Sequence, residues 1–175
     1  MQQTSIDLRS MIRDIPDFPE PGILFRDITP LLANPEGLKE VNRLLVERYR
    51  DRRIDKVVGI ESRGFIFGAP LALALGAGFI PARKPGKLPH KTVEETYTLE
   101  YGSNVLTMHE DGIEDGEQIL VVDDLLATGG TLGATCNLIE RLGGEIVEIA
   151  VLIELTALGG RDNLGDRLLH TLLQY

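Results

Sequence analysis

Apolar residues along the chain fall mainly into short, nearly continuous runs that alternate with segments of helical spacing. The runs, each bounded by glycine, proline or polar residues, occupy residues 57–60, 79–82, 119–122 and 146–153. Such runs are typical of strands that are covered on both faces. Helices are predicted between them, one reaching Leu75 and one over residues 131–142. The alternation predicts an α/β fold with a mainly parallel central sheet flanked by helices.

The N-terminal part predicts two further helices separated by a loop. The first spans about residues 4–16, and its apolar face is made of Leu8, Met11, Ile12 and Ile15. Residues 16–22 contain three prolines and a glycine, which predicts a loop. The second helix begins at Asn34, which caps it ahead of Pro35, and ends near Tyr49.

Length and composition favour a single domain over residues 1–175, because 43% of the residues are hydrophobic and can form a sizeable core. Residues 83–108 interrupt the alternation of strands and helices and are richer in Lys, Pro, Thr and Tyr. They predict a long loop with an irregular hairpin made of residues 92–101 and 104–108. Excursions of this length are often functional.

The charge of the chain argues against several kinds of partner. A net charge of -9 leaves too few cations for a long track of nucleic-acid phosphates, so no nucleic-acid partner is expected. The N-terminus lacks the apolar stretch of a membrane span or signal peptide, so neither membrane association nor export is expected. Cys136 has no disulfide partner, which fits a reducing cytoplasm. No metal-ligand spacing is found around Cys136 or the three histidines, so no protein metal site is predicted.

Polar residues gather directly after the apolar run at residues 119–122. Asp123 and Asp124, which we call the acid pair, follow that run directly. They therefore lie at the carboxyl edge of the sheet, where ligands of open α/β folds bind. The next helix starts within a neutral turn that we call the phosphate cradle, consisting of Ala127, Thr128, Gly129, Gly130 and Thr131. Free N–H groups at a helix start suit a phosphate dianion, and glycines let it approach the main chain.

Two acids beside a neutral cradle match the asymmetry of a sugar phosphate. Ribose hydroxyls donate to carboxylates, whereas a 5-phosphate needs N–H and O–H donors. The cradle lacks the Gly-Lys-Ser/Thr ending of a nucleoside triphosphate loop and the spacing of the dinucleotide fingerprint. An ordinary strand-to-helix turn would explain either half alone, but the combination favours a binding site.

Two other segments reach the same edge of the sheet. The apolar run at residues 57–60 ends in the tight turn Glu61-Ser62-Arg63-Gly64, and the run at 79–82 ends in a segment with three cations. These cations are Arg83, Lys84 and Lys87. Charge runs are usually solvated, yet the position of this one would allow it to meet pyrophosphate.

The run from residue 119 to 131 resembles the motif that binds 5-phosphoribosyl-1-pyrophosphate in type I phosphoribosyltransferases, and weaker resemblance continues over nearly the whole chain. The resemblance implies the fold of that family. It also implies that the turn with Ser62, Arg63 and Gly64 forms a pyrophosphate loop with a non-proline cis peptide between Ser62 and Arg63. Arg83 and Lys87 would bind pyrophosphate, in some family members across a subunit boundary, so that a homodimer would be functional.

Segments around the purine are identified by the same resemblance. Residues 97–102 resemble the flexible catalytic loop, in which Glu100 would contact the purine as the attacking nitrogen loses its proton, with Tyr101 beside it. Residues 1–33 would include a short hood over the base, as in the adenine-specific members of the family. In this hood Phe25 would stack on the purine, and the backbones of Leu24 and Arg26 would read its edge. Leu155 would cover the other side.

The reaction implied is reversible: adenine and phosphoribosyl pyrophosphate give AMP and pyrophosphate. Mg²⁺ is implied because the leaving pyrophosphate needs its charge neutralised, and the ion would be held mainly by ligand oxygens and water. Asp123 and Asp124 would hold the ribose and stabilise positive charge on it. Three alternatives stay open: transfer to hypoxanthine, guanine or xanthine; a non-catalytic regulator that binds the same pyrophosphate sugar; and a generic flavodoxin-like binding domain.

Overall fold

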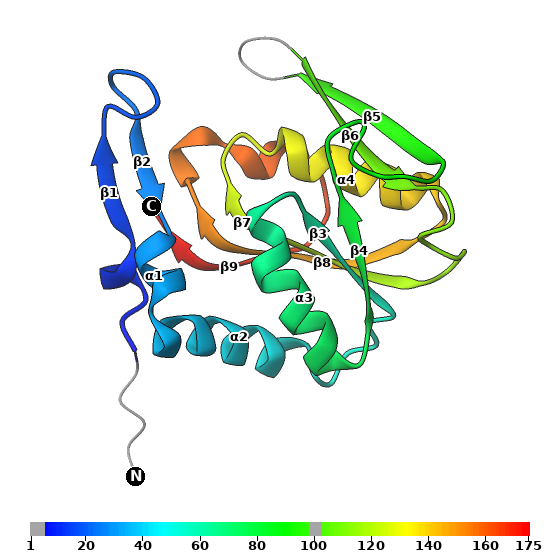
Figure 1. The fold of residues 1–175 in the computed structure, drawn as a ribbon, viewed down its shortest axis with the longest axis horizontal. Helices are drawn as coiled ribbons and strands as arrows, with labels where there is room; N and C mark the ends of the chain where they lie inside the picture. Colours follow the sequence, from blue (N-terminus) through cyan, green and yellow to red (C-terminus); the bar gives the residue numbers. More distant parts are fainter. Residues whose placement is uncertain (1–5, 99–102) are drawn as a thin grey trace. The chain divides into compact units, whose positions relative to one another are not determined.

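The computed structural model describes residues 6–98 and 103–175 (Figure 1). The chain divides into two compact units, Met1–Glu47 and Arg48–Tyr175. The smaller unit holds a hairpin and helices, and the larger unit holds the central sheet. In the described residues no helix has the combined length and apolar character required to span a bilayer.

The smaller unit starts with a hairpin, so the helix predicted over residues 4–16 is wrong. Within residues 6–16 lie η1 (Arg9–Met11) and β1 (Arg13–Pro16), and β2 (Leu24–Asp27) follows after a loop. Strand β1 pairs antiparallel with β2, and Ile15 lies opposite Phe25. Helical spacing of a few apolar residues cannot exclude a strand, because a partner strand supplies the backbone hydrogen bonds that a helix would have made.

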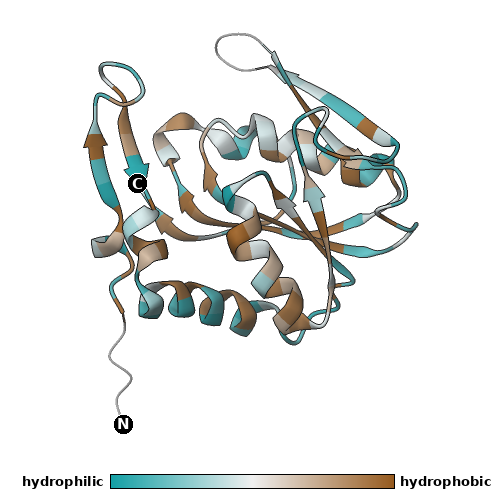
Figure 2. Ribbon diagram, viewed as in Figure 1, coloured by the Kyte–Doolittle hydropathy of each residue, from teal (hydrophilic) through white to brown (hydrophobic). Residues whose placement is uncertain are grey.

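The loop predicted at residues 16–22 is confirmed, since it joins β1 to β2. Two helices follow, α1 (Thr29–Ala33) and α2 (Pro35–Tyr49). Asn34 Oδ1 accepts hydrogen bonds from the N–H groups of Glu36 and Gly37, both at 3.0 Å, which confirms the predicted cap. Polar and apolar residues alternate along α2 as expected for an amphipathic helix (Figure 2).

The larger unit is built on a five-stranded, entirely parallel sheet with the strand order β4-β3-β7-β8-β9. Its strands are β3 (Lys56–Ile60), β4 (Gly78–Ala82), β7 (Gln118–Leu126), β8 (Glu145–Glu154) and β9 (Leu169–Gln174). Four of them match the predicted apolar runs, although β7 continues four residues beyond the predicted end at residue 122. The α/β prediction with a mainly parallel sheet is confirmed.

The helices of the larger unit define where a ligand can enter. Helix α3 (Arg63–Leu75) connects β3 to β4, and α4 (Gly130–Arg141) connects β7 to β8. These connections leave the adjacent strands β3 and β7 in opposite directions along the sheet. Because such crossovers are right-handed, α3 and α4 cover opposite faces. The loops after β3 and β7 therefore diverge, which opens a crevice at the carboxyl edge of the sheet.

A two-stranded hairpin stands beside this sheet. It is formed by β5 (Thr92–Thr98) and β6 (Ser103–His109), as the sequence predicts for residues 83–108. A bridge between Arg83 and Thr107 joins the hairpin to the segment after β4. Helix α4 lies next to the hairpin and carries Cys136, which is fully buried in the core. Burial raises the pKa of the Cys136 thiol to about 12.

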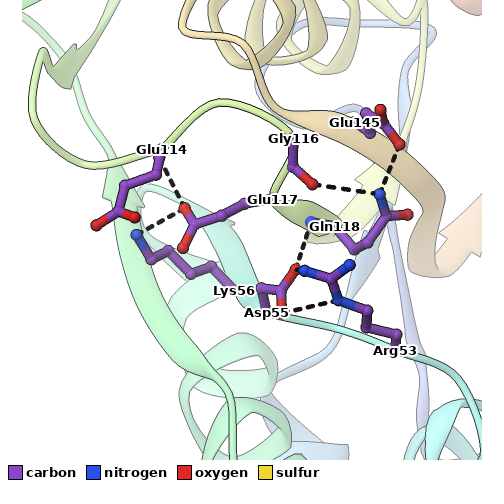
Figure 3. Close-up of polar contacts among 8 residues, drawn as sticks. All are labelled: Arg53, Asp55, Lys56, Glu114, Gly116, Glu117, Gln118 and Glu145. Carbon is purple, nitrogen blue, oxygen red and sulfur yellow. Dashed lines mark hydrogen bonds and ion pairs between the residues drawn. The ribbon is translucent and has the colours of Figure 1, made fainter.

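The amino edge of the sheet is closed by paired polar side chains (Figure 3). Asp55 Oδ2 accepts a hydrogen bond from the N–H of Gln118 at 2.8 Å, and the Gln118 amide donates to Glu145 at 2.6 Å. Lys56 Nζ lies 2.7 Å from Glu117 Oε2. These contacts link the first residues of β3, β7 and β8. The amino edge thus has a structural role, and the carboxyl edge is left to bind a ligand.

Candidate active site

A cavity of about 340 Å³ occupies the crevice between the diverging loops after β3 and β7. Its walls contain both elements that the sequence predicts as a sugar-phosphate site, the acid pair and the complete phosphate cradle, and also part of the turn after β3. The lining residues are Ile60, Glu61, Ser62, Arg63, Lys84, Tyr97, Leu106 and residues 123–132. Segments more than 60 residues apart in the sequence therefore share one cavity.

The phosphate cradle is shaped by a left-handed glycine. Gly129 has φ +85° and directly precedes α4, and its carbonyl accepts the first bond of the helix from Gly133 N at 2.8 Å. A Cβ atom at Gly129 would overlap the carbonyl oxygen of Gly160. Glycine is thus required both by the backbone conformation and by the neighbouring chain. The first turn of α4 leaves N–H groups without intrahelical partners, which suits an anion.

A second segment supports the cradle from outside the cavity. It is the 3-10 turn η3 (Gly160–Leu164), whose Asn163 side chain donates to the carbonyl of Thr128 at 2.6 Å. A Cβ at Gly160 would overlap the carbonyl oxygen of Ala127. Sequence reasoning missed the roles of Gly160 and Asn163. The only available signal was the adjacent pair of glycines at 159 and 160.

The acid pair lies at the centre of the cavity wall on β7. Asp124 is buried and forms an ion pair with Arg63, the first residue of α3. Asp123 Oδ1 accepts a hydrogen bond from the N–H of Asp124 at 2.9 Å. Burial, and then the neighbouring Asp124 carboxylate, raise the pKa of Asp123 well above its ordinary value. The Asp123 carboxyl group therefore holds its proton more tightly than a solvated aspartate does.

Asp123→Asn should stabilise the ligand-free protein at neutral and alkaline pH. A raised pKa in the folded state means that Asp123 contributes stability below its unfolded pKa and loses it as pH rises through the folded value. The neutral amide avoids that loss and can still accept from Asp124 N. Urea unfolding at pH 5 and pH 8 should show a larger free energy of unfolding for the variant, with the wider gap at pH 8. An equal gap at both pH values would contradict the assignment.

The turn after β3 has the tight geometry that the sequence predicts, with one correction. The non-proline cis peptide joins Glu61 to Ser62, whereas the prediction placed it between Ser62 and Arg63. A short motif predicts a tight turn but does not identify which peptide bond of the turn is cis. Gly64 is required here, because a Cβ at this position would lie 2.7 Å from the carbonyl oxygen of Val122 on β7.

The predicted cations separate into two groups. Arg63 and Lys84 line the cavity, whereas Arg83 and Lys87 do not. The Arg83 guanidinium donates to both carboxylate oxygens of Glu61 at 3.1 and 3.2 Å and to the Lys87 carbonyl at 3.2 Å. Hydrogen bonds from Arg83 lower the pKa of Glu61. Within this chain Arg83 thus pairs with the residue that begins the turn after β3.

The residues expected around the purine are only partly described. Glu100 and Tyr101 lie outside the described residues. Leu24, Phe25 and Arg26 lie on β2 of the smaller unit, where the Phe25 ring makes an edge-to-face contact with Phe18 at 5.2 Å between centroids. The next expected residue, Leu155, is half-buried at the end of β8, where its N–H donates to the Leu126 carbonyl at 2.9 Å.

The carboxylates around the cavity determine how the implied Mg²⁺ ion could be coordinated. Among residues 6–98 and 103–175, no group of three or more His, Cys, Asp or Glu side chains is placed to share an ion. The acid pair can supply at most part of a coordination shell. Mg²⁺ retains water and commonly binds through one or two carboxylates and substrate phosphates. The pair therefore fits an ion that arrives with its substrate.

Comparison with known proteins assigns the class. A model of the phosphoribosyl transferase domain matches residues 27–167. The chain is 56% identical over 172 residues to adenine phosphoribosyltransferase of Chloroflexus aurantiacus, covering 98% of this chain and 99% of the relative. The fold and cavity thus belong to a phosphoribosyltransferase.

Solved structures agree with this class. The adenine phosphoribosyltransferase of Thermoanaerobacter pseudethanolicus superposes with a TM-score of 0.93 at 46% identity, covering 96% of this chain and 98% of that one. The Saccharomyces cerevisiae enzyme, complexed with an imino-altritol bisphosphate and adenine, gives 0.89 at 40% identity, covering 95% and 96%. The chain belongs to the adenine phosphoribosyltransferase family.

Proposed function

We propose that the protein transfers the 5-phosphoribosyl group of phosphoribosyl pyrophosphate to adenine, giving AMP and pyrophosphate. The observation that carries the proposal is the cavity at the β3/β7 crevice, in which the acid pair lies next to an uncharged phosphate cradle. The choice of adenine is supported by the names of the relatives and by the adenine bound to the Saccharomyces cerevisiae structure.

The acid pair and the cradle divide the work of holding the ribose phosphate. The cradle offers N–H and hydroxyl donors to the 5-phosphate, while Asp123 and Asp124 accept hydrogen bonds from the ribose hydroxyls. The bond from the anomeric carbon to pyrophosphate breaks, its electron pair leaves with pyrophosphate, and a bond to the purine nitrogen forms. Positive charge that develops on the ribose is stabilised by the nearby carboxylates.

Pyrophosphate would leave along the wall formed by the turn after β3. Ser62, Arg63 and Lys84 line that wall, and two of them are cationic. Gly64 lets the turn pack closely against β7. We also propose that Arg83 and Lys87 bind pyrophosphate. Their binding would require Arg83 to release Glu61 or to act on a neighbouring subunit.

The purine would be held by residues from other parts of the chain. We assign stacking to Phe25, edge recognition to the backbones of Leu24 and Arg26, and cover of the opposite side to Leu155. Glu100 would receive or guide the proton lost by the attacking nitrogen, with Tyr101 beside it. These assignments rest on the sequence resemblance.

Mg²⁺ is the expected cofactor. It neutralises charge on the leaving pyrophosphate when bound. The acid pair would contribute to its coordination, with phosphate oxygens and water supplying the remaining ligands. Chelation should therefore stop turnover without unfolding the protein.

A homodimer is the assembly that we expect, formed through α3. Beyond Arg63, the exposed residues of this helix are apolar and include Ile66, Pro70 and Leu73, of which Leu73 is 85% exposed. After Arg63 the helix contains no charged residue. A helix that is apolar all round usually has a partner on each side. A second copy of the chain would cover this face.

Leu73→Lys should convert the dimer into a monomer. A charge at the centre of an apolar interface must be desolvated without a partner, which opposes association. Light scattering after size-exclusion chromatography should give the mass of two chains for the wild type and of one for the variant. Leu168→Lys is the matched control, since Leu168 is also exposed but lies before β9. Monomeric wild type would refute the dimer.

We also propose a cytoplasmic location. The only cysteine, Cys136, is a buried free thiol, which is common in reducing compartments. Cell fractionation of the source organism tests this location.

A base-competition assay tests the proposed reaction. Purified protein, Mg²⁺ and phosphoribosyl pyrophosphate are incubated with adenine, hypoxanthine, guanine or xanthine, and nucleotide formation is followed. We expect AMP from adenine and little product from the oxo-purines. Preference for an oxo-purine would contradict the assigned base, and absence of any nucleotide would favour the non-catalytic regulator.

A further inference from the structure

Two residues of the cavity wall come from the hairpin, Tyr97 and Leu106, and of these only Tyr97 carries a polar group. Tyr97, on β5, lines the cavity together with the acid pair and the cradle. Its hydroxyl oxygen lies 3.2 Å from Oγ1 of Thr131, the last residue of the cradle. The two residues are 34 positions apart in sequence. The contact therefore joins the hairpin to the start of α4.

Counting hydrogen atoms fixes the direction of this bond when a phosphate is present. A threonine hydroxyl has one proton to donate and can accept two hydrogen bonds. A phosphate dianion only accepts, so a Thr131 hydroxyl that binds the phosphate gives it that proton and can no longer donate to Tyr97. The Tyr97 hydroxyl must then donate to Thr131 Oγ1. Tyr97 thus favours the orientation of the Thr131 hydroxyl in which its proton points toward the bound phosphate.

The hairpin is held against α4 by other contacts. Glu95 forms an ion pair with Arg141 and accepts from Asn137 Nδ2 at 2.9 Å, and Arg141 also donates to the Glu94 carbonyl at 2.8 Å. The Tyr97 ring packs against the core. The Tyr97 hydroxyl is consequently not needed to attach the hairpin. Among residues 6–98 and 103–175, the hydroxyl makes its hydrogen bond to the cradle.

We propose that Tyr97 is a positioning residue for the 5-phosphate, acting through Thr131. The inference rests on the proposed function, because it takes the cradle to be the 5-phosphate site. It predicts a selective effect. Ligands that carry the 5-phosphate should depend on the Tyr97 hydroxyl, and ligands that lack it should not.

Tyr97→Phe tests the inference because it keeps the ring packed and removes only the hydroxyl. The KM values for phosphoribosyl pyrophosphate in the forward reaction and for AMP in the reverse reaction should both rise roughly 3- to 10-fold. The KM values for adenine and pyrophosphate should stay unchanged. Titration calorimetry with ribose 5-phosphate should show the same loss of affinity without any turnover.

Glu95→Gln serves as the control for displacement of the hairpin, since it weakens the ion pair to Arg141 and leaves the Tyr97 hydroxyl in place. It should not reproduce the phosphate-selective pattern. The inference is overturned if Tyr97→Phe affects all four substrates alike, if it affects none, or if Glu95→Gln gives the same pattern. Wild-type protein that binds ribose 5-phosphate but makes no AMP would refute the proposed function alone, since the calorimetric comparison remains decisive for Tyr97.

Discussion

Asp124→Asn should reduce the rate of AMP formation by roughly 100- to 1,000-fold, the usual cost of removing one preorganised electrostatic contact to a transition state. Asp124 is 6% exposed and belongs to the cavity wall. Its carboxylate is placed to accept from a ribose hydroxyl and to stabilise positive charge on the sugar. Asparagine has the same shape but no charge, so the loss should appear mainly in kcat.

The fold should survive this substitution. The Arg63 partner of Asp124 has a side chain that is 46% exposed, so water can solvate the guanidinium when the carboxylate is lost. Steady-state kinetics and thermal unfolding of the same preparation measure both effects. Asp111→Asn makes the same charge change at an exposed position away from the cavity and should leave the rate unchanged. Activity within a few-fold of wild type would remove Asp124 from the mechanism.

Gly129→Ala should raise the KM for phosphoribosyl pyrophosphate and for AMP by roughly 100-fold, the effect expected of a displacement of about 1 Å in a positioning element. The added methyl group would overlap the Gly160 carbonyl oxygen and would lie 3.1 Å from Cβ of Asn163. The cradle cannot accommodate it without moving away from η3. The N–H groups at the start of α4 would then no longer meet the phosphate.

Gly116→Ala is a matched control for backbone strain. Gly116 has φ +79°, close to the +85° of Gly129, but no atom lies within 4 Å of the position of an added Cβ. Both variants should lose about 1–2 kcal/mol of folding free energy from the left-handed conformation. Only Gly129→Ala should also lose affinity for the phosphate ligands. If both variants bind ribose 5-phosphate like wild type, the cradle does not hold the phosphate.

The parts of the fold that could be predicted from sequence are those governed by local pattern. The runs at residues 57–60, 79–82, 119–122 and 146–153 are apolar on both faces, except at Glu148, and are typical of strands in a covered sheet. Asn34 satisfies helix N–H groups within three residues of itself, so its cap could also be read directly. The prediction of a helix over residues 4–16 was wrong because the structure of this segment depends on a partner strand about ten residues later.

The candidate site also contains residues that local sequence pattern could predict and residues that it could not. The acid pair, the cradle and the turn after β3 follow predicted strands, so their meeting at one sheet edge could be deduced from topology. The contributions of Tyr97, Gly160 and Asn163 could not, because each acts through a contact with a segment 30 or more residues away. The pairing of Arg83 with Glu61 was also hidden, because it joins two turns that lie 22 residues apart in the sequence.

Because Cys136 is buried, its reaction with an alkylating reagent can report local opening of the structure around α4. Burial raises the pKa of the thiol to about 12, so little reactive thiolate forms near neutral pH, and the core shields the sulfur from reagents. Alkylation of the native protein therefore requires α4 to separate from the sheet. The labelling rate measures how often the helix that begins at the cradle detaches, with no engineered probe.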